Sequence, residues 1–173
     1  MNINYRKATS DDAYAWYRFK NKVWRDAYKN IFPEEVFLEQ EQNLKQKEQS
    51  FNKRFCNNDE KIAYIAEHDG KIVGLMFGTL KSTYDYFHQE YADLVALYID
   101  PKYQGRGIGT ELKNIFEKWA KEHGATKYVI GVLRDNHRAR QVYERWGGKL
   151  SKHEEDFITL GVGYGEVFYL YDL

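Results

Sequence analysis

Cysteine, proline and long apolar runs are scarce in this sequence of 173 residues. The single cysteine, Cys56, excludes an internal disulfide framework and every zinc site that needs several cysteines. No segment approaches the roughly 20 consecutive apolar residues of a membrane span, and residues 1–6 lack the apolar core of a signal peptide. We therefore expect one folded domain over residues 1–173, in a reducing cytoplasm and without a membrane partner.

An excess of charge of one sign is also missing, because 26 Lys and Arg balance 26 Asp and Glu. A general nucleic-acid binder needs a basic surplus to contact phosphates, so we expect no nucleic-acid partner. The five histidines show no metal-ligand spacing, and we expect no metal site. Aromatic residues, in contrast, are plentiful: 15 Tyr, 10 Phe and 4 Trp suit a ring-rich core or, as the alternative, a groove lined by rings.

Seven segments have the apolar pattern of strands. They are residues 3–8, 61–67, 71–80, 93–99, 127–133, 149–155 and 166–170. Asp69-Gly70, between the second and third, is typical of a tight hairpin. The fourth segment is almost continuously apolar after Asp93, which predicts a central strand covered on both faces. The sequence predicts a mixed α/β fold.

Helical spacing of apolar residues predicts helices over residues 13–28, 108–120 and 136–146. Capping residues at 9–12 precede the first of these, and Gly124 suits the end of the second. A further stripe at steps of seven, seven and four predicts one more helix: Phe37, Leu44, Phe51 and Phe55. This stripe is compatible with a homodimer, although it is too short for us to expect a coiled-coil arm.

The most informative stretch lies between the fourth predicted strand and the helix that begins near Ile108. It is Gln104-Gly105-Arg106-Gly107-Ile108-Gly109-Thr110. Its three glycines leave N–H groups free to converge on an anion at the positive end of the helix dipole, which predicts a phosphate cradle. A dinucleotide fingerprint would need a third glycine where Leu112 stands, and a P-loop would need a lysine. The alternative is a glycine turn that allows close helix–strand packing.

This stretch resembles the acyl-CoA pyrophosphate loop, Q/R-x-x-G-x-G/A, of the GNAT superfamily of N-acetyltransferases. Residues 136–147 are similar to its second signature, N-x-x-A-x-x-x-Y-x-x-x-G, and Gly148 departs from it where the family often has Phe. The resemblance implies a mixed, mostly antiparallel central sheet of six or seven strands flanked by helices. Its fourth and fifth strands, residues 93–99 and 127–133, would be splayed apart.

The same resemblance implies acetyl-CoA as co-substrate. The backbone of the fourth strand would pair with the pantetheine arm, the glycine loop would hold the pyrophosphate, and the asparagine of the second signature would contact the pantetheine or stabilise its helix. The implied cofactor-binding residues are Leu97, Tyr98, Ile99, Gln104, Gly105, Arg106, Gly107, Ile108, Gly109, Thr110 and Asn136.

The resemblance also places Tyr143 near the thioester sulfur, where its phenol would protonate the departing thiolate. The alternative for Tyr143 is a core aromatic on a helix stripe. A backbone N–H of the fourth strand, at Leu97, would stabilise the oxyanion. Asp93 opens that strand, where some family members place an acidic base that acts through water; otherwise it is a strand-initiating acid. Glu90, His88 and solvent are weaker choices of base.

The link between the first two helices commonly borders the acceptor groove in this family. Residues predicted on the acceptor side are Trp24, Tyr28, Glu34 and Tyr84, and packing is the alternative for each. The resulting hypothesis is an N-acetyltransferase that transfers the acetyl group of acetyl-CoA directly to a primary amine of a small cationic, polyamine-like molecule. The alternatives are a peptide or protein amino-terminal or lysine acetyltransferase, a non-catalytic acyl-CoA sensor, and a protein whose glycine loop is only a turn.

Overall fold

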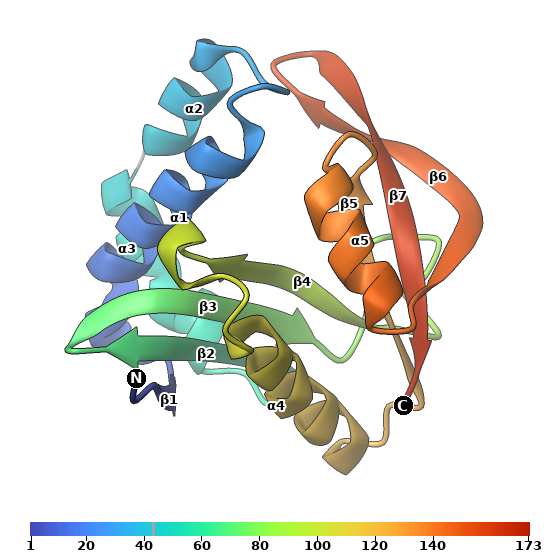
Figure 1. Cartoon of the computed structure of the whole chain (residues 1–173), viewed down its shortest axis with the longest axis horizontal. Coiled ribbons are helices and arrows are strands. Elements are labelled where there is room, and N and C mark those ends of the chain that lie inside the picture. Colours follow the sequence, from blue (N-terminus) through green and yellow to red (C-terminus); the bar gives the residue numbers. More distant parts are fainter. Residues whose placement is uncertain (43) are drawn as a thin grey trace.

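A computed structural model describes residues 1–42 and 44–173 as one sheet with helices on both faces (Figure 1). The strands are β1 (Asn4–Lys7), β2 (Lys61–His68), β3 (Lys71–Thr79), β4 (Ala92–Ile99), β5 (Lys127–Leu133), β6 (Lys149–Thr159) and β7 (Val162–Asp172). The helices are α1 (Ala13–Tyr28), α2 (Glu34–Glu41), α3 (Leu44–Phe51), α4 (Ile108–Glu122) and α5 (His137–Arg145). The order of strands and helices along the chain is the predicted one, except that α2 and α3 stand where a single helix was predicted.

The seven strands lie in the order β1-β2-β3-β4-β5-β7-β6. Every neighbouring pair is antiparallel except β4 and β5, which α4 connects as a parallel crossover. The predicted hairpin between β2 and β3 is confirmed, because Asp69 and Gly70 both adopt positive φ angles, of 49° and 69°. The mostly antiparallel sheet implied by the sequence resemblance is therefore present.

Strands β4 and β5 separate soon after they begin. They pair only at Ala92–Tyr128 and Asp93–Val129. The register of β4 against β3 also shifts along this stretch, and Leu94 and Leu97, three residues apart, both pack toward α4. Strict alternation would place such residues on opposite faces, so an irregularity lies between them. The predicted splay is confirmed, and it limits full burial of β4 to its first three residues.

One face of the sheet is covered by α4, and α5 packs beside it (Figure 1). Ile108, Leu112 and Phe116 of α4 are almost completely buried in this core. The other face carries α1 and α3, where Trp16 and Phe51 meet edge to face with ring centroids 5.6 Å apart. The two cores hold the sheet between two helical layers.

The single helix predicted from the spacing of Phe37, Phe51 and Phe55 is wrong. The chain is extended at Gln42, with ψ of 152°, so α2 ends there and α3 begins at Leu44; residue 43 lies outside the described residues. Phe37 packs against the end of α1, whereas Phe51 and Phe55 pack under its start. Apolar spacing does not reveal that these side chains belong to two separate cores. Because Phe37, Phe51 and Phe55 are all buried within the chain, the stripe offers no basis for a coiled-coil arm.

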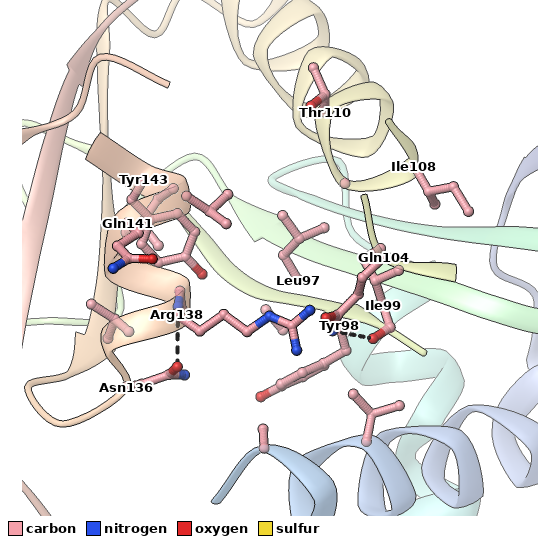
Figure 2. A pocket seen from close by; sticks show the side chains of 18 of the residues that line it. Leu97, Tyr98, Ile99, Gln104, Ile108, Thr110, Asn136, Arg138, Gln141 and Tyr143 are labelled. Atoms are coloured by element: carbon pink, nitrogen blue, oxygen red, sulfur yellow. Dashed lines mark hydrogen bonds between the residues drawn. The ribbon is translucent and has the colours of Figure 1, made fainter. Parts of the chain in front are cut away.

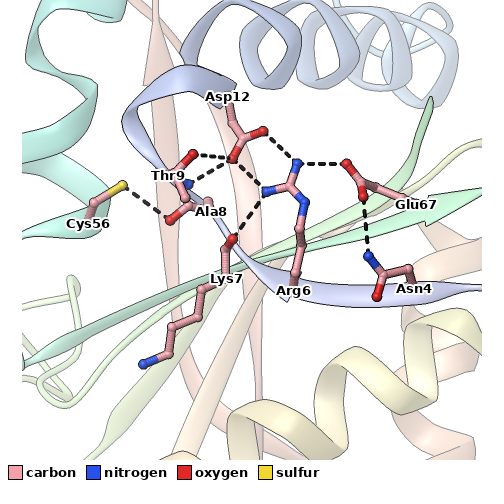
Figure 3. Close-up of polar contacts among 8 residues, drawn as sticks. All are labelled: Asn4, Arg6, Lys7, Ala8, Thr9, Asp12, Cys56 and Glu67. Carbon is pink, nitrogen blue, oxygen red and sulfur yellow. Dashed lines mark hydrogen bonds and ion pairs between the residues drawn. The ribbon is translucent and has the colours of Figure 1, made fainter. Parts of the chain in front are cut away.

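The first helix begins at a network of ion pairs and hydrogen bonds shown in Figure 3. Asp12 accepts from the backbone N–H of Thr9 at 2.7 Å, in a capping box that confirms the predicted helix start. Arg6 of β1 binds both oxygens of Asp12, at 2.7 and 2.8 Å, and also Glu67 of β2 at 2.6 Å. The hydrogen bond from Arg6 lowers the pKa of Asp12. Beside it, the thiol of Cys56 contacts the carbonyl of Ala8.

Candidate active site

The splayed strands border a cleft of about 780 Å³. Its walls are the unpaired part of β4, the middle of β5, one face of α5, the loop before α4 and the end of α1 (Figure 2). Between Leu94 and Ile99, the edge of β4 that faces β5 has no strand partner. Apart from the carbonyl of Ile99, which accepts from the Gln104 side chain, the N–H and C=O groups on this edge are therefore free to pair with an extended ligand chain, as an added strand would.

The glycine loop closes one end of this cleft. Gly105 and Gly107 have φ angles of 75° and 82°, in the left-handed region that favours glycine, and Gly107 caps α4. A Cβ at either glycine would meet no atom within 4 Å, so backbone conformation and not crowding requires glycine here. The first amides of a helix have no acceptor within it, and the N-terminus of α4 lies at the cleft. The loop is therefore a ready site for an anion.

Gln104 ties this loop to the end of β4, because its side-chain amide donates to the carbonyl of Ile99 at 3.0 Å. Its side-chain oxygen is buried without a hydrogen-bond partner among the described residues. Ten of the eleven predicted cofactor-binding residues line the cleft. The exception is Arg106, whose guanidinium lies over the ring of Tyr103, 5.7 Å from its centroid, and against Met1.

Helix α5 presents Asn136, Arg138 and Tyr143 to the cleft (Figure 2). Asn136 caps the helix, since its side-chain oxygen accepts from the N–H of Ala139 at 3.2 Å. The exposed side chain of Arg138, which sequence reasoning did not select, reaches across the cleft toward Tyr98 of β4. A guanidinium there is suited to phosphate or carbonyl oxygens.

The Tyr143 side chain packs between Trp146 and Tyr169, with ring centroids 5.8 and 5.9 Å away. Burial raises the pKa of its phenol, so the hydroxyl keeps its proton at neutral pH. The carbonyl of Tyr143 accepts from Tyr171 at 2.8 Å, which holds this turn of α5 against β7. Tyr143 thus packs against the core, as one prediction had it, and also lines the cleft; its role as proton donor stays a prediction.

Of the four residues predicted on the acceptor side, only Tyr28 lines the cleft. Trp24 is buried between Tyr28, Phe32 and Phe37. Glu34 points outward and pairs with Arg25 at 2.6 Å. Tyr84 lies behind β5 and reaches β7 instead.

Asp93, the predicted base, is fully buried at the start of β4 and does not line the cleft. Its Oδ2 accepts three hydrogen bonds from the following loop: from the Ser82 hydroxyl at 3.1 Å, the Thr83 N–H at 2.9 Å and the Thr83 hydroxyl at 2.8 Å. Burial raises the pKa of Asp93 although these bonds oppose it. The contacts indicate a structural acid, and the catalytic role of Asp93 stays a prediction.

Sequence reasoning missed Glu166, a carboxylate where the apolar part of β7 begins. Its side chain lies next to Gly131, which lines the cleft, although Glu166, like Asp93, does not line it. Glu166 is 9% exposed, and its Oε1 accepts from the Tyr84 hydroxyl at 2.8 Å. Burial, with Glu155 and Asp93 nearby, raises the pKa of Glu166 to about 7. The signal was present, since Glu166 opens an apolar run just as Asp93 does.

A protein-family model described as the Acetyltransferase (GNAT) family matches residues 16–148. The chain belongs to this family. Both signatures that carried the sequence resemblance lie inside the matched residues. GNAT relatives in sequence include an uncharacterised N-acetyltransferase of Methanocaldococcus jannaschii, 30% identical over 95 residues. That alignment covers 55% of this chain and 42% of the relative, which is less than half its length.

Solved structures share the GNAT fold over nearly all of the chain. The PaiA N-acetyltransferase of Thermoplasma acidophilum, in complex with coenzyme A, is 21% identical with a TM-score of 0.70, covering 99% of this chain and 100% of that one. The ribosomal-protein-alanine N-acetyltransferase of Brucella melitensis is 18% identical with a TM-score of 0.72, covering 98% and 99%. At these identities the likeness establishes the fold alone.

In residues 1–42 and 44–173, no group of three or more His, Cys, Asp or Glu side chains is placed to hold a metal ion. Within the same ranges, no helix has the length and hydropathy needed to cross a bilayer.

Proposed function

We propose that this protein is an acetyl-CoA-dependent N-acetyltransferase that transfers the acetyl group directly to a primary amine. The observation that carries the proposal is the cleft between β4 and β5, with the glycine loop at one end and Tyr143 on its wall. Direct transfer needs both substrates in one site, and the cleft has a second side, at the end of α1, where Asp26, Ala27 and Tyr28 line it. Family membership supports the same reaction.

Acetyl-CoA fits this cleft by the chemistry of its lining. The pyrophosphate would be held by the N-terminal amides of α4 and by the left-handed turns at Gly105 and Gly107. The extended pantetheine arm has amides that match the unpaired edge of β4. Arg138 would add a positive charge for the phosphates. When bound, acetyl-CoA supplies a thioester whose carbonyl carbon accepts the amine.

Two groups of this chain would lower the barrier. The backbone N–H of Leu97, on the unpaired edge of β4, would donate to the carbonyl oxygen as it gains negative charge. The phenol of Tyr143 would give its proton to the sulfur as the carbon–sulfur bond breaks. Because burial keeps that phenol protonated, it is in the donor form over the physiological pH range.

The acceptor that the lining favours is a small cationic amine of the polyamine type. The ring of Tyr28, the ring of Tyr98 and the carboxylate of Asp26 line the α1 side of the cleft, and a cation is attracted to both kinds of group. The second candidate is a peptide or protein amino terminus. It is supported by the likeness to an enzyme named for a ribosomal-protein alanine.

Two measurements on the purified protein test this proposal. Isothermal titration with acetyl-CoA should show saturable binding, and its absence would contradict the cleft as a coenzyme site. Release of free thiol is then followed with spermidine, with a short peptide that begins with alanine, and with a lysine peptide whose amino terminus is blocked. Turnover of spermidine above both peptides is expected. Acetyl-CoA binding without thiol release from any acceptor would indicate a sensor and refute the catalytic proposal.

A further inference from the structure

Tyr84, in the loop before β4, and Glu166, on β7, form a polar pair although they are 82 residues apart in sequence. The Tyr84 hydroxyl donates to Oε1 of Glu166 at 2.8 Å. The ring of Tyr84 also meets Phe168, two residues along β7, with centroids 4.7 Å apart. Nothing in the reaction proposed above uses this pair. Among the described residues, this buried carboxylate meets a hydroxyl and no cation, which is costly for the fold and is typical of functional sites.

Gly131 of β5 connects this pair to the cleft. Gly131 itself lines the cleft, at the point where β4 and β5 have parted. A Cβ at this position would collide with the Tyr84 hydroxyl and would lie 3.0 Å from Oε1 of Glu166. Glycine is therefore required for the close approach of the two side chains. Because no side chain stands at residue 131, the pair occupies the space next to the cleft wall.

Hydrogen bonds fix the loop that carries Tyr84. Asp93 anchors Ser82 and Thr83 through the three hydrogen bonds already described, and the Tyr84 N–H donates to the Ser82 hydroxyl at 3.2 Å. The Tyr84 hydroxyl thus has a defined position. In this arrangement Asp93 is a positioning residue that acts through the loop.

The surroundings of Glu166 contain acids and phenols. The titratable groups that face it from neighbouring elements are Tyr84 of the loop, Asp93 and Tyr98 of β4, Tyr28 of α1 and Glu155 of β6. The nearby guanidinium of Arg134 is paired instead with Glu154 at 2.6 Å. Among the described residues, Oε2 of Glu166 makes no hydrogen bond. Burial and like charge raise the pKa of Glu166 to about 7, which suits a group that exchanges protons near neutrality.

We infer that Glu166 is the base that takes a proton from the ammonium group of the acceptor, while Tyr84 holds its carboxylate beside Gly131. The inference rests on the proposed acetyl transfer and adds to it a residue outside both family signatures. It also specifies the acceptor chemistry: the substrate arrives as a protonated primary amine, attracted by the carboxylate and by the rings of Tyr28 and Tyr98.

The proton and electron balance of the step is complete. The ammonium nitrogen gives one proton to Glu166 and, as a neutral amine, uses its lone pair to bond to the thioester carbon. The carbon–sulfur bond then breaks with its electron pair on sulfur, which takes the proton of the Tyr143 phenol. The second proton of the new amide nitrogen restores that phenol, and Glu166 releases its proton to solvent. The products are the amide, the free thiol and one proton.

The test is the pH dependence of kcat/KM with spermidine and with the alanine peptide. We expect Glu166→Gln to lower kcat/KM by about 10²–10⁴ and to abolish the acidic limb near pH 7, with acetyl-CoA affinity unchanged. Tyr84→Phe should move that limb to higher pH, because the lost hydrogen bond stabilises the carboxylate. A residue with only a structural role would not move the limb. The matched control is Asp172→Asn, an exposed carboxylate on the same strand, which should keep the native profile.

The outcomes separate this inference from the proposed function. If the native protein turns over an acceptor and Glu166→Gln retains the acidic limb at a rate within threefold, the base lies elsewhere and the inference is overturned while the function stands. If the native protein acetylates no amine, both are overturned. Should Glu166→Gln fail to fold, the pH profile of kcat/KM for Tyr84→Phe tests the inference. A shift of its acidic limb to higher pH supports the inference, and an unmoved limb refutes it.

Discussion

The raised pKa of Glu166 makes a quantitative prediction about stability that is independent of catalysis. Glu166→Gln keeps the shape of the side chain and an oxygen that accepts from Tyr84, but removes the ionisation. In the folded protein the pKa is about 7, against 4.5 for a free glutamate. A pKa that is raised on folding stabilises the fold fully below the unfolded value, and this contribution is lost as the pH rises through the folded value.

The size of the effect follows from the two pKa values of Glu166. At about 1.4 kcal/mol for each pKa unit, the difference of about 2.5 units between 4.5 and about 7 corresponds to about 3.5 kcal/mol over the whole titration. Of this, the native protein should lose about 2.5 kcal/mol of unfolding free energy between about pH 5 and pH 8.5. Because glutamine does not ionise, the variant does not lose this amount. Relative to the native protein, Glu166→Gln should therefore gain about 2.5 kcal/mol over that interval.

Urea denaturation followed by tryptophan fluorescence measures this difference at each pH. The control is Asp172→Asn, whose carboxylate is 82% exposed and should give the same difference from the native protein at every pH. A free-energy difference between native protein and Glu166→Gln that does not change with pH would refute the reasoning. It would show that Glu166 titrates as an ordinary exposed carboxyl group.

Two other predictions concern the coenzyme side of the cleft. Tyr143→Phe should lower kcat by about 10²–10⁴ while acetyl-CoA affinity in calorimetry stays near native; an unchanged kcat would remove Tyr143 from the acid role. Gly107→Ala should weaken acetyl-CoA binding, because alanine resists φ of 82° at the start of α4. Gly124→Ala, at φ of 85° beyond the other end of the same helix, is its matched control: both variants should lose similar stability, about 1 kcal/mol, and only Gly107→Ala should lose affinity. Equal affinities would contradict the cradle.

Much of the coenzyme side could be predicted from the sequence because its determinants are local. The left-handed turns at Gly105 and Gly107, the start of α4 and the cap at Asn136 each depend on a few consecutive residues. The splay was implied by resemblance, and the two residue pairs between β4 and β5 confirm it. Arg106 was predicted less well, because its guanidinium lies over the ring of Tyr103 and the residue does not line the cleft.

The acceptor side was predicted less well, since long-range packing decides it. Trp24 is an aromatic residue in the predicted region, but three neighbouring rings enclose it and only Tyr28 reaches the cleft. The break at Gln42 was missed for a related reason. Apolar spacing shows that residues will be buried and does not show in which core, so one stripe was taken as one helix.

The sequence by itself determined the order of the strands and of every helix except α2 and α3, together with the hairpin at Asp69, the glycine bend and the helix cap, because each depends on neighbours along the chain. Only the tertiary structure decided which acid reaches a residue of the cleft wall. Asp93 and Glu166 each open an apolar run of the sequence, and the sequence pattern treats them alike. The loop at Ser82 encloses Asp93, whereas strand register pairs Glu166 with Leu133 and lets its carboxylate reach Gly131. Both outcomes depend on contacts between segments distant in the chain.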